Sequence, residues 1–293
     1  MKIGFLGLGH MGMPMARNLV RAGYEVRGYD VVDAAREAAA EEGVPLAESA
    51  TDAVTGADVV VTMFPAGKHV LEAYRGGLLD AAAPGTLFIE SSTIAVHEAQ
   101  EAHELAVAAG HRNIDAPVSG GVVGAENGTL AFMVGGSEDD FAAAHPILDV
   151  MGGRIVHCGG SGLGQAAKVC NNMILAVSQI AVGEAFVLGE RLGLTHEALF
   201  DVAANASGQC WALTTNCPVP GPVPTSPANR DYQPGFAGAL MAKDLGLALQ
   251  AIEQTSTDAQ MGRLAQQIYA AFAAGPGAAR DFSGIITDIR DAS

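Results

Sequence analysis

Lys168 and Asn172 are the side chains best suited to proton chemistry in this chain of 293 residues. They are four residues apart in a segment of helical composition, so they share a helix face. Small and apolar residues flank Lys168, where burying an ammonium is costly without a partner. An isolated lysine would instead keep its head group in water. An ammonium can protonate a carbonyl oxygen, and the neutral amine can deprotonate a hydroxyl group. We therefore predict that Lys168 is a general acid/base, with the Asn172 amide one helical turn away.

A second pattern is the turn Gly7-Leu8-Gly9-His10-Met11-Gly12, which follows an apolar strand and precedes a helix. Gly7 permits a tight turn, Gly9 lets the backbone approach a pyrophosphate, and Gly12 lets the helix pack closely on the strand. The amides at the start of the helix then face the phosphates. The pattern predicts a dinucleotide-binding loop.

Asp30 ends the second expected strand, where its carboxylate can accept hydrogen bonds from the adenosine ribose. The same carboxylate would repel a 2′-phosphate, and Val31 and Val32 supply no cation to bind one. We therefore expect NAD rather than NADP as the cofactor. Arg27 and Arg36 are the nearest cations that could weaken this preference.

Two kinds of domain are expected to hold these residues. Residues 1–163 alternate short β-rich runs with helical patterns, which predicts a Rossmann domain with a mostly parallel sheet. Its further strands are expected at Asp58 to Phe64, Thr86 to Glu90, Asn113 to Ala116, Leu130 to Val134 and Arg154 to Cys158. Residues 164–293 are expected to form an all-α domain. A long interdomain helix, Gln165 to Leu192, joins the two, and we expect the active site in the cleft between them.

The long helix also bears on assembly. Between Ile174 and Leu188 it lacks the wide polar face of a surface helix, so it is central to its domain or packs on another subunit as well. Gly183 and Gly189 would allow a close approach. We predict a homodimer or homotetramer.

Composition excludes several classes of protein. The formal net charge of −16 disfavours binding to nucleic acid or anionic membrane. We find no apolar run long and uninterrupted enough to span a bilayer, and no targeting segment before the first strand, so we expect a cytoplasmic protein. The four cysteines and eight histidines lack metal-ligand spacing, so we expect no metal site. We also expect reduced thiols and no disulfides, because the chain is acidic and shows no signal peptide.

Four ordered motifs resemble the β-hydroxyacid dehydrogenase family, and they lie at residues 7–19, 115–121, 162–172 and 243–245. Within that family, residues 207–211, 216–221 and 236–248 are similar to the 3-hydroxyisobutyrate dehydrogenases. The resemblance implies that Lys168 is the acid/base and that Asn172 orients it and the substrate. It also implies that the turn Ser119-Gly120-Gly121 binds the substrate carboxylate.

The same resemblance implies further contacts. Contacts with the cofactor are implied for Phe64, Pro65, Thr93 and Lys243. The alternative for the first three is that they only close loops between strands and helices. The alternative for Lys243 is a solvated ion pair with Asp244. Trp211 and Phe236 would form an apolar wall for the substrate, or they are simply core residues. 

The resemblance implies NAD-dependent oxidation of 3-hydroxyisobutyrate to methylmalonate semialdehyde, a step of valine catabolism, and this is the expected activity. Two alternatives stay open. Tartronate semialdehyde reductase shares the four motifs, but its substrate carries an additional hydroxyl group. A cofactor-binding scaffold without catalysis is also possible, although such a protein would be expected to have lost Lys168.

Overall fold

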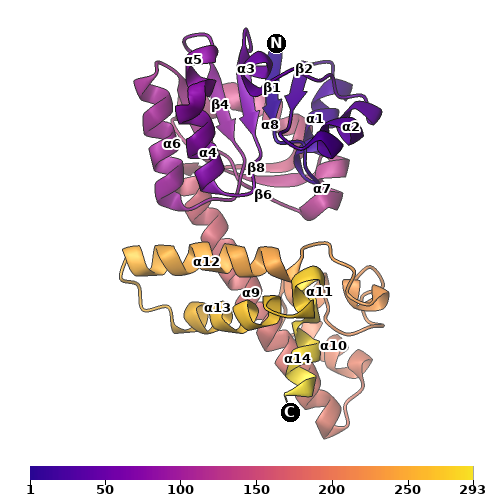
Figure 1. The fold of residues 1–293 in the computed structure, drawn as a ribbon. Helices are drawn as coiled ribbons and strands as arrows, with labels where there is room; N and C mark the ends of the chain where they lie inside the picture. Colours follow the sequence, from indigo (N-terminus) through magenta and orange to yellow (C-terminus); the bar gives the residue numbers. More distant parts are fainter. Residues whose placement is uncertain (293) are drawn as a thin grey trace. The chain divides into compact units, whose positions relative to one another are not determined.

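The computed structural model describes residues 1–292, which form two compact units that divide between Lys168 and Val169. Figure 1 shows a sheet covered by helices in the first unit and helices alone after helix α9 (Leu163–Leu192). The predicted fold class, a Rossmann domain followed by an all-α domain, is confirmed. The division falls five residues after the predicted boundary at residues 163/164.

The sheet of the first unit has the strand order β2-β1-β3-β4-β5-β7-β6, and β8 pairs with β7. Strands β1 to β5 pair in parallel, as do β7 and β8, whereas β7 runs antiparallel to β5 and β6. The strands are β1 (Lys2–Leu6), β2 (Glu25–Tyr29), β3 (Val59–Thr62), β4 (Leu87–Glu90), β5 (Arg112–Asp115), β6 (Val118–Ser119), β7 (Leu130–Gly135) and β8 (Gly152–Gly159). Strand order reverses at β1, so the loops after β1 and β3 flank the position where such sheets bind ligands.

Helices cover both faces of this sheet, which explains its nearly continuous apolar strands. Phe5 and Val61 point into the core on one face, and Leu6 and Val60 point into the core on the other. The helices are α1 (Gly12–Arg21), α2 (Asp33–Glu41), α3 (Ala50–Val54), α4 (Gly67–Ala73), a π-turn (Tyr74–Leu78), α5 (Leu79–Ala81), α6 (Val96–Ala108), α7 (Gly121–Asn127) and α8 (Glu138–Met151).

The second unit is built around the later turns of α9. Ala176 and Ile180 of α9 pack with buried residues of α12 and α13, which lie side by side in Figure 1. The other elements are α10 (His196–Ala204), α11 (Trp211–Thr214), α12 (Gly238–Gln254), α13 (Gln260–Ala273), α14 (Ile285–Asp291) and short 3₁₀ turns at Pro227–Arg230, Pro276–Ala279 and Phe282–Gly284.

Helix α9 corrects two expectations. It is long and apolar enough by composition to cross a membrane, contrary to the expectation that no segment of the chain is. Half of that apolar window is buried inside the chain, and a core helix passes the same test. Gly183 and Gly189 do allow close approach, but a Cβ atom there would meet Ile289 and Leu199 of the same chain.

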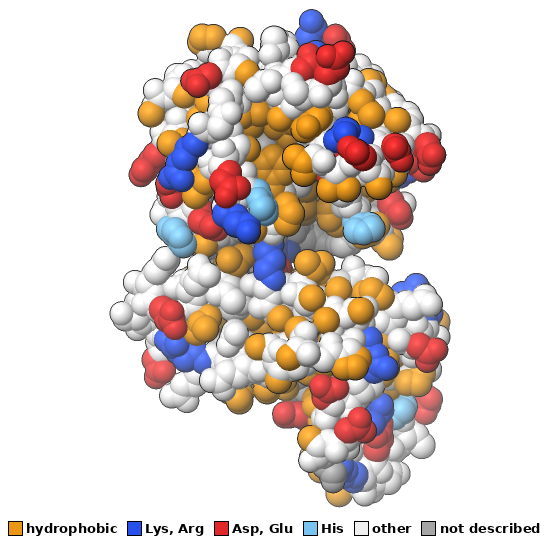
Figure 2. Space-filling model, in the orientation of Figure 1, with side chains coloured by type: hydrophobic (Ala, Val, Ile, Leu, Met, Phe, Trp, Pro, Cys, Tyr) orange, Lys and Arg blue, Asp and Glu red, His pale blue; other side chains and the backbone are white. Residues whose placement is uncertain are grey.

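Charged side chains are dispersed over the surface. Figure 2 shows Lys and Arg singly among Asp and Glu on the visible face. Arg27 contacts Asp52 at 2.5 Å, and Arg17 contacts Glu42 at 2.7 Å. Several cations are therefore neutralised locally.

Candidate active site

The glycine turn after β1 has the geometry that a dinucleotide loop requires. Gly7 has φ +92°, a conformation that favours glycine, and a Cβ atom there would collide with the Met63 carbonyl oxygen. A Cβ atom at Gly12 would collide with the Gly7 carbonyl oxygen. At Gly9 a Cβ atom would meet nothing within 4 Å, so the space beside this residue is open. The turn fits a pyrophosphate held by backbone amides.

Asp30 is fixed beside this turn by backbone donors. Its Oδ2 accepts a hydrogen bond from the Leu8 amide at 2.7 Å, and its Oδ1 accepts one from the Val32 amide at 2.8 Å. Arg36 donates to the Asp30 carbonyl oxygen at 2.5 Å and also pairs with Asp33. The carboxylate is thus oriented in advance, and the cation nearest to it already has partners. His10 is exposed, and Met11 is half-buried.

Phe64 lies against the glycine turn. Its ring carbon Cδ1 would be 3.2 Å from a Cβ atom on Gly7, and its amide donates to Ser92 Oγ at 2.7 Å. Pro65 is exposed beside it, and Thr93 is half-buried after Ser92. The structure therefore brings the loops after β1, β3 and β4 together at the carboxyl edge of the sheet.

Lys168 is buried, with 6% of its surface exposed. Its Nζ donates to the Val118 carbonyl oxygen at 2.7 Å. Val118 directly precedes Ser119, so the lysine is bonded to the backbone that leads into the predicted carboxylate anchor. Gly120 and Gly121 have φ values of +133° and +62°, which only glycine adopts readily.

Asn172 lies one turn after Lys168 and is also buried. Its Nδ2 donates to Asp244 Oδ2 at 2.6 Å, and its Oδ1 accepts from Asn171 at 3.0 Å. Asp244 is 6% exposed, so it is not the solvated acid that an exposed Lys243–Asp244 ion pair would require. Lys243 is half-buried on α12. Sequence reasoning named Asp244 only as a neighbour of Lys243 and missed its bond to Asn172.

The two aromatic candidates lie in different surroundings. Phe236 is half-buried and meets Phe282 edge to face, with ring centroids 5.7 Å apart. Trp211 begins α11 and is 51% exposed. Their contact with a substrate stays a prediction.

Asp115 is a buried carboxylate that sequence reasoning placed in a motif but gave no role. It ends β5, and its two oxygens accept from the Gly162 amide at 2.7 Å and the Gln165 amide at 2.8 Å. Burial raises the pKa of Asp115 to about 6, although these amides favour the charged form. The signal in the sequence that could have revealed this role is a carboxylate at the end of a strand, shortly before the predicted carboxylate anchor at Ser119. Asp115 fixes the beginning of α9 and therefore the turn that carries Lys168.

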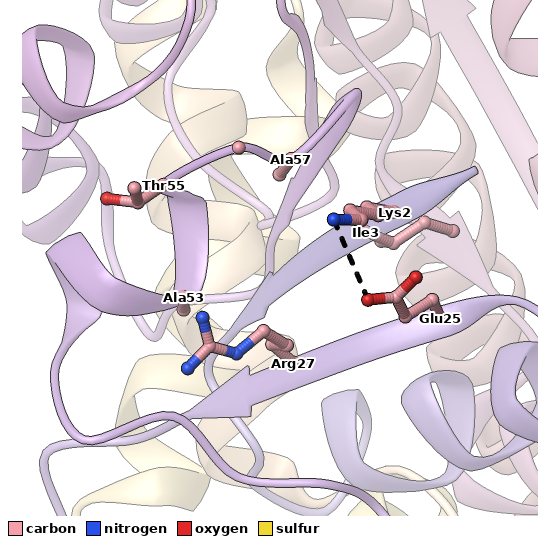
Figure 3. A pocket seen from close by; sticks show the side chains of 8 residues that line it. Lys2, Ile3, Glu25, Arg27, Ala53, Thr55 and Ala57 are labelled. Atoms are coloured by element: carbon pink, nitrogen blue, oxygen red, sulfur yellow. Dashed lines mark ion pairs between the residues drawn. The ribbon is translucent and has the colours of Figure 1, made fainter.

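A small hollow of about 80 Å³ lies at the other edge of the sheet (Figure 3). Lys2 and Glu25 line it from the amino ends of β1 and β2, and Lys2 Nζ lies 3.9 Å from Glu25 Oε1. The glycine turn follows the carboxyl end of β1, so this hollow is separate from the cofactor loop.

Comparison with known proteins decides the family. Residues 2–160 match the NAD binding domain of 6-phosphogluconate dehydrogenase, and residues 162–289 match a model described as NAD-binding of NADP-dependent 3-hydroxyisobutyrate dehydrogenase. The chain belongs to the β-hydroxyacid dehydrogenase family. Both models describe NAD-binding domains, and the turn and Asp30 fit NAD. This member of the family is therefore an NAD-dependent oxidoreductase.

Individual relatives agree over nearly their full length. A probable 3-hydroxyisobutyrate dehydrogenase of Mycobacterium tuberculosis is 57% identical, with 98% of this chain and 97% of that one covered. An NAD-dependent L-serine dehydrogenase of Pseudomonas aeruginosa is 47% identical, with 96% and 95% covered. A solved structure of the M. tuberculosis 3-hydroxyisobutyrate dehydrogenase with L-serine has a TM-score of 0.96 at 57% identity, with 99% of each chain covered.

Proposed function

We propose that this β-hydroxyacid dehydrogenase oxidises 3-hydroxyisobutyrate to methylmalonate semialdehyde with NAD. The bond from Lys168 Nζ to the Val118 carbonyl oxygen is the observation that carries the proposal. It ties a buried amine to the backbone immediately before Ser119. One contact thus relates the proposed proton-transfer group to the proposed carboxylate anchor.

Each residue has a proposed role in the chemistry. Bound NAD supplies the hydride acceptor for the hydroxymethyl carbon of the substrate. A neutral Lys168 amine can donate one N–H to Val118 and still use its lone pair to accept the hydroxyl proton. Asn172, which Asp244 holds at 2.6 Å, orients the lysine and the substrate. In the reverse direction the Lys168 ammonium returns the proton to the carbonyl oxygen.

The substrate's remaining groups set the expected specificity. The Ser119 hydroxyl and the amides of Gly120 and Gly121 would bind its carboxylate, and Trp211 and Phe236 are the proposed apolar contacts for its methyl group. A hydroxyl in place of that methyl would be desolvated without compensation, at a cost of roughly 1 to 3 kcal/mol. Tartronate semialdehyde reduction is therefore disfavoured as the main activity.

L-Serine is a second candidate substrate, because one relative is an NAD-dependent L-serine dehydrogenase and one similar solved structure is described with L-serine. It shares the hydroxymethyl group and the carboxylate of 3-hydroxyisobutyrate, and an ammonium replaces the methyl. Its oxidation would use the same roles for Lys168 and Ser119. An ammonium needs a carboxylate or several acceptors when it is buried, whereas a methyl needs only apolar contacts.

A panel of hydroxy acids tests the proposal, with NADH formation followed by absorbance. We expect kcat/KM to rank 3-hydroxyisobutyrate above 3-hydroxypropionate, and both well above glycerate, L-serine and phosphogluconate. Glycerate as the best substrate would favour the tartronate semialdehyde reductase alternative, and L-serine as the best would favour a serine dehydrogenase. NAD binding without turnover of any hydroxy acid would favour a non-catalytic scaffold. A role in valine catabolism and a cytoplasmic location are further parts of the proposal.

A further inference from the structure

The Gln165 side chain joins the start of helix α9 to the loop after β4. It is completely buried. Its Nε2 donates to the Ser92 carbonyl oxygen at 2.7 Å, and its Oε1 accepts from the Ile94 amide at 3.2 Å. A single side-chain amide therefore binds the backbone on both sides of Thr93.

The Ser92 end of this contact reaches the neighbouring loop. Ser92 Oγ accepts from the Phe64 amide at 2.7 Å, and the Ser92 amide donates to Glu90 Oε1 at 2.8 Å. Phe64 in turn lies beside Gly7. The loops after β3 and β4, which carry three predicted cofactor contacts, are thus linked to each other and to Gln165.

The helix end of the contact is equally constrained. The Gln165 backbone amide donates to Asp115 at 2.8 Å, and Lys168, three residues later on the same face, donates to Val118. Asp115 and Val118 both belong to the segment that leads into Ser119. The first turn of α9 is therefore the point where the loops after β3, β4 and β5 are connected.

We propose that Gln165 is a positioning residue that fixes the Ser92–Ile94 loop to the turn carrying Lys168. The position of Thr93 in this loop is thereby fixed relative to the proton-transfer group. The proposal rests on the functions assigned above to Thr93 and Lys168. Its physical basis is the pairing of both halves of the amide. Any shift or rotation of this side chain leaves a buried donor or acceptor without a partner.

Gln165→Met removes both hydrogen bonds while keeping a side chain of similar length. Gln179→Met is the matched control, because Gln179 is also completely buried on α9 but bonds Asn216 in the second unit. The readouts are the Kd for NAD by calorimetry, amide hydrogen exchange of a peptide spanning Ser92–Ile94 without cofactor, and kcat. Circular dichroism and the unfolding midpoint monitor folding.

For Gln165→Met we expect faster exchange at Ser92–Ile94 and a Kd for NAD raised on the order of tenfold, with a lower kcat. Gln179→Met should leave the exchange and the Kd within about twofold of the wild type. Equal effects of the two variants would overturn the proposal, because they would show only the loss of a buried amide. Faster exchange with an unchanged Kd would also overturn it.

Gln165→Glu provides a second test that does not depend on the methionine variant folding. A protonated carboxyl can accept from the Ile94 amide and donate to the Ser92 carbonyl oxygen, as the amide does, whereas a carboxylate cannot donate. The titratable groups around this position are Asp115 of β5, Glu90 of β4 and Lys168 on α9. Complete burial raises the pKa of a carboxyl at this position, and negative charge on either acid raises it further, whereas a charged Lys168 opposes the rise.

The Kd of this variant for NAD should therefore be close to that of the wild type at pH 5.5 and rise towards the Gln165→Met value at pH 8.5. The ratio of the Gln179→Met and wild-type Kd values should be the same at both pH values. A pH-independent ratio of the Gln165→Glu and wild-type Kd values would contradict the proposal. Neither the exchange nor the NAD titration requires turnover, so both results stand even if Lys168 proves not to be the acid/base.

Discussion

At the scale of single residues, the proposed chemistry depends most on Lys168. Lys168→Ala should lower kcat by roughly a hundredfold or more, the usual contribution of a positioned acid/base, and leave the Kd for NAD nearly unchanged. Steady-state kinetics and a calorimetric titration measure the two quantities. Lys2→Ala is the control, because Lys2 is exposed at the other edge of the sheet beside the hollow of Figure 3.

Near-native kcat in Lys168→Ala would exclude the assigned role. The wild-type rate of oxidation should also rise with pH, because only the neutral amine accepts a proton. A flat profile would count against Lys168 as the base.

We predict that Asp30 sets the choice between the two nicotinamide cofactors. We expect the wild type to prefer NAD, because the carboxylate would repel a 2′-phosphate and Arg36 is already bonded to the Asp30 carbonyl oxygen and to Asp33. Asp30→Ala should raise the ratio of NADP to NAD in kcat/KM by on the order of tenfold, chiefly by removing that repulsion. NAD affinity should fall as well, since Asp30 also holds the Leu8 amide.

Asp58→Ala removes an acid that bonds the Lys2 amide at the amino end of β1, so it should leave the ratio unchanged. Equal or better turnover of the wild type with NADP at matched concentrations would show that Asp30 does not select against the 2′-phosphate.

Residue type and local spacing were sufficient to predict the glycine turn, Asp30, Lys168 and Asn172 as candidates. Gly7 and Gly12 are required by contacts that any Rossmann turn makes, so their pattern is visible in the sequence. Gln165 and Asp115 are different, because their partners lie 71 to 73 and 47 to 50 residues away. Only the packed sheet brings these groups within hydrogen-bond distance.

At the scale of elements, the start of α9 depends on a carboxyl group that is costly to ionise. Burial raises the pKa of Asp115 from 3.8 to about 6, so between those pH values the folded state binds more protons than the unfolded state. Its contribution to stability therefore increases as pH falls through 6. The neighbouring Cys158 thiol, whose pKa is raised chiefly by burial, stays neutral in this range.

Asp115→Asn removes this titration. The unfolding free energy of the wild type minus that of the variant should grow by about 3 kcal/mol or less between pH 7.5 and pH 4. Chemical denaturation at a series of pH values measures it. Asp52→Asn is the control of opposite sign: the Glu48 amide and Arg27 lower the pKa of Asp52, so its stabilisation is lost only as pH falls below about 4. A difference for Asp115→Asn that is constant or shrinks on acidification would contradict the prediction.

Most elements followed the sequence closely, and two short ones were missed. Helix α9 and strands β3, β4, β5, β7 and β8 begin and end within about two residues of their expected limits, because the apolar pattern of each is clear in the sequence. Strand β6 (Val118–Ser119) and helix α7 were not predicted. They are two and seven residues long, and β6 exists only through its pairing with β7.

At the scale of the whole molecule, an exposed stripe on α9 supports the prediction of a homo-oligomer. Ile174, Ala181, Ala185 and Leu188 are exposed at spacings of seven, four and three residues, so they follow one side of the helix. Ile174 and Leu188 are 65% and 59% exposed. A second copy of the same stripe would bury these side chains, which the chain itself leaves in water.

Sedimentation equilibrium tests this assembly. We expect the wild type at micromolar concentration to have two or four times the 29.9 kDa mass of the chain. Ile174→Glu combined with Leu188→Glu places two carboxylates in the stripe and should reduce the mass towards that of one chain, because burying unpaired charges opposes association. Val107→Glu is the matched control, since Val107 is 52% exposed on α6 in the first unit. A monomeric wild type would refute the oligomer, whereas an unchanged mass in the double variant would place the interface on another surface.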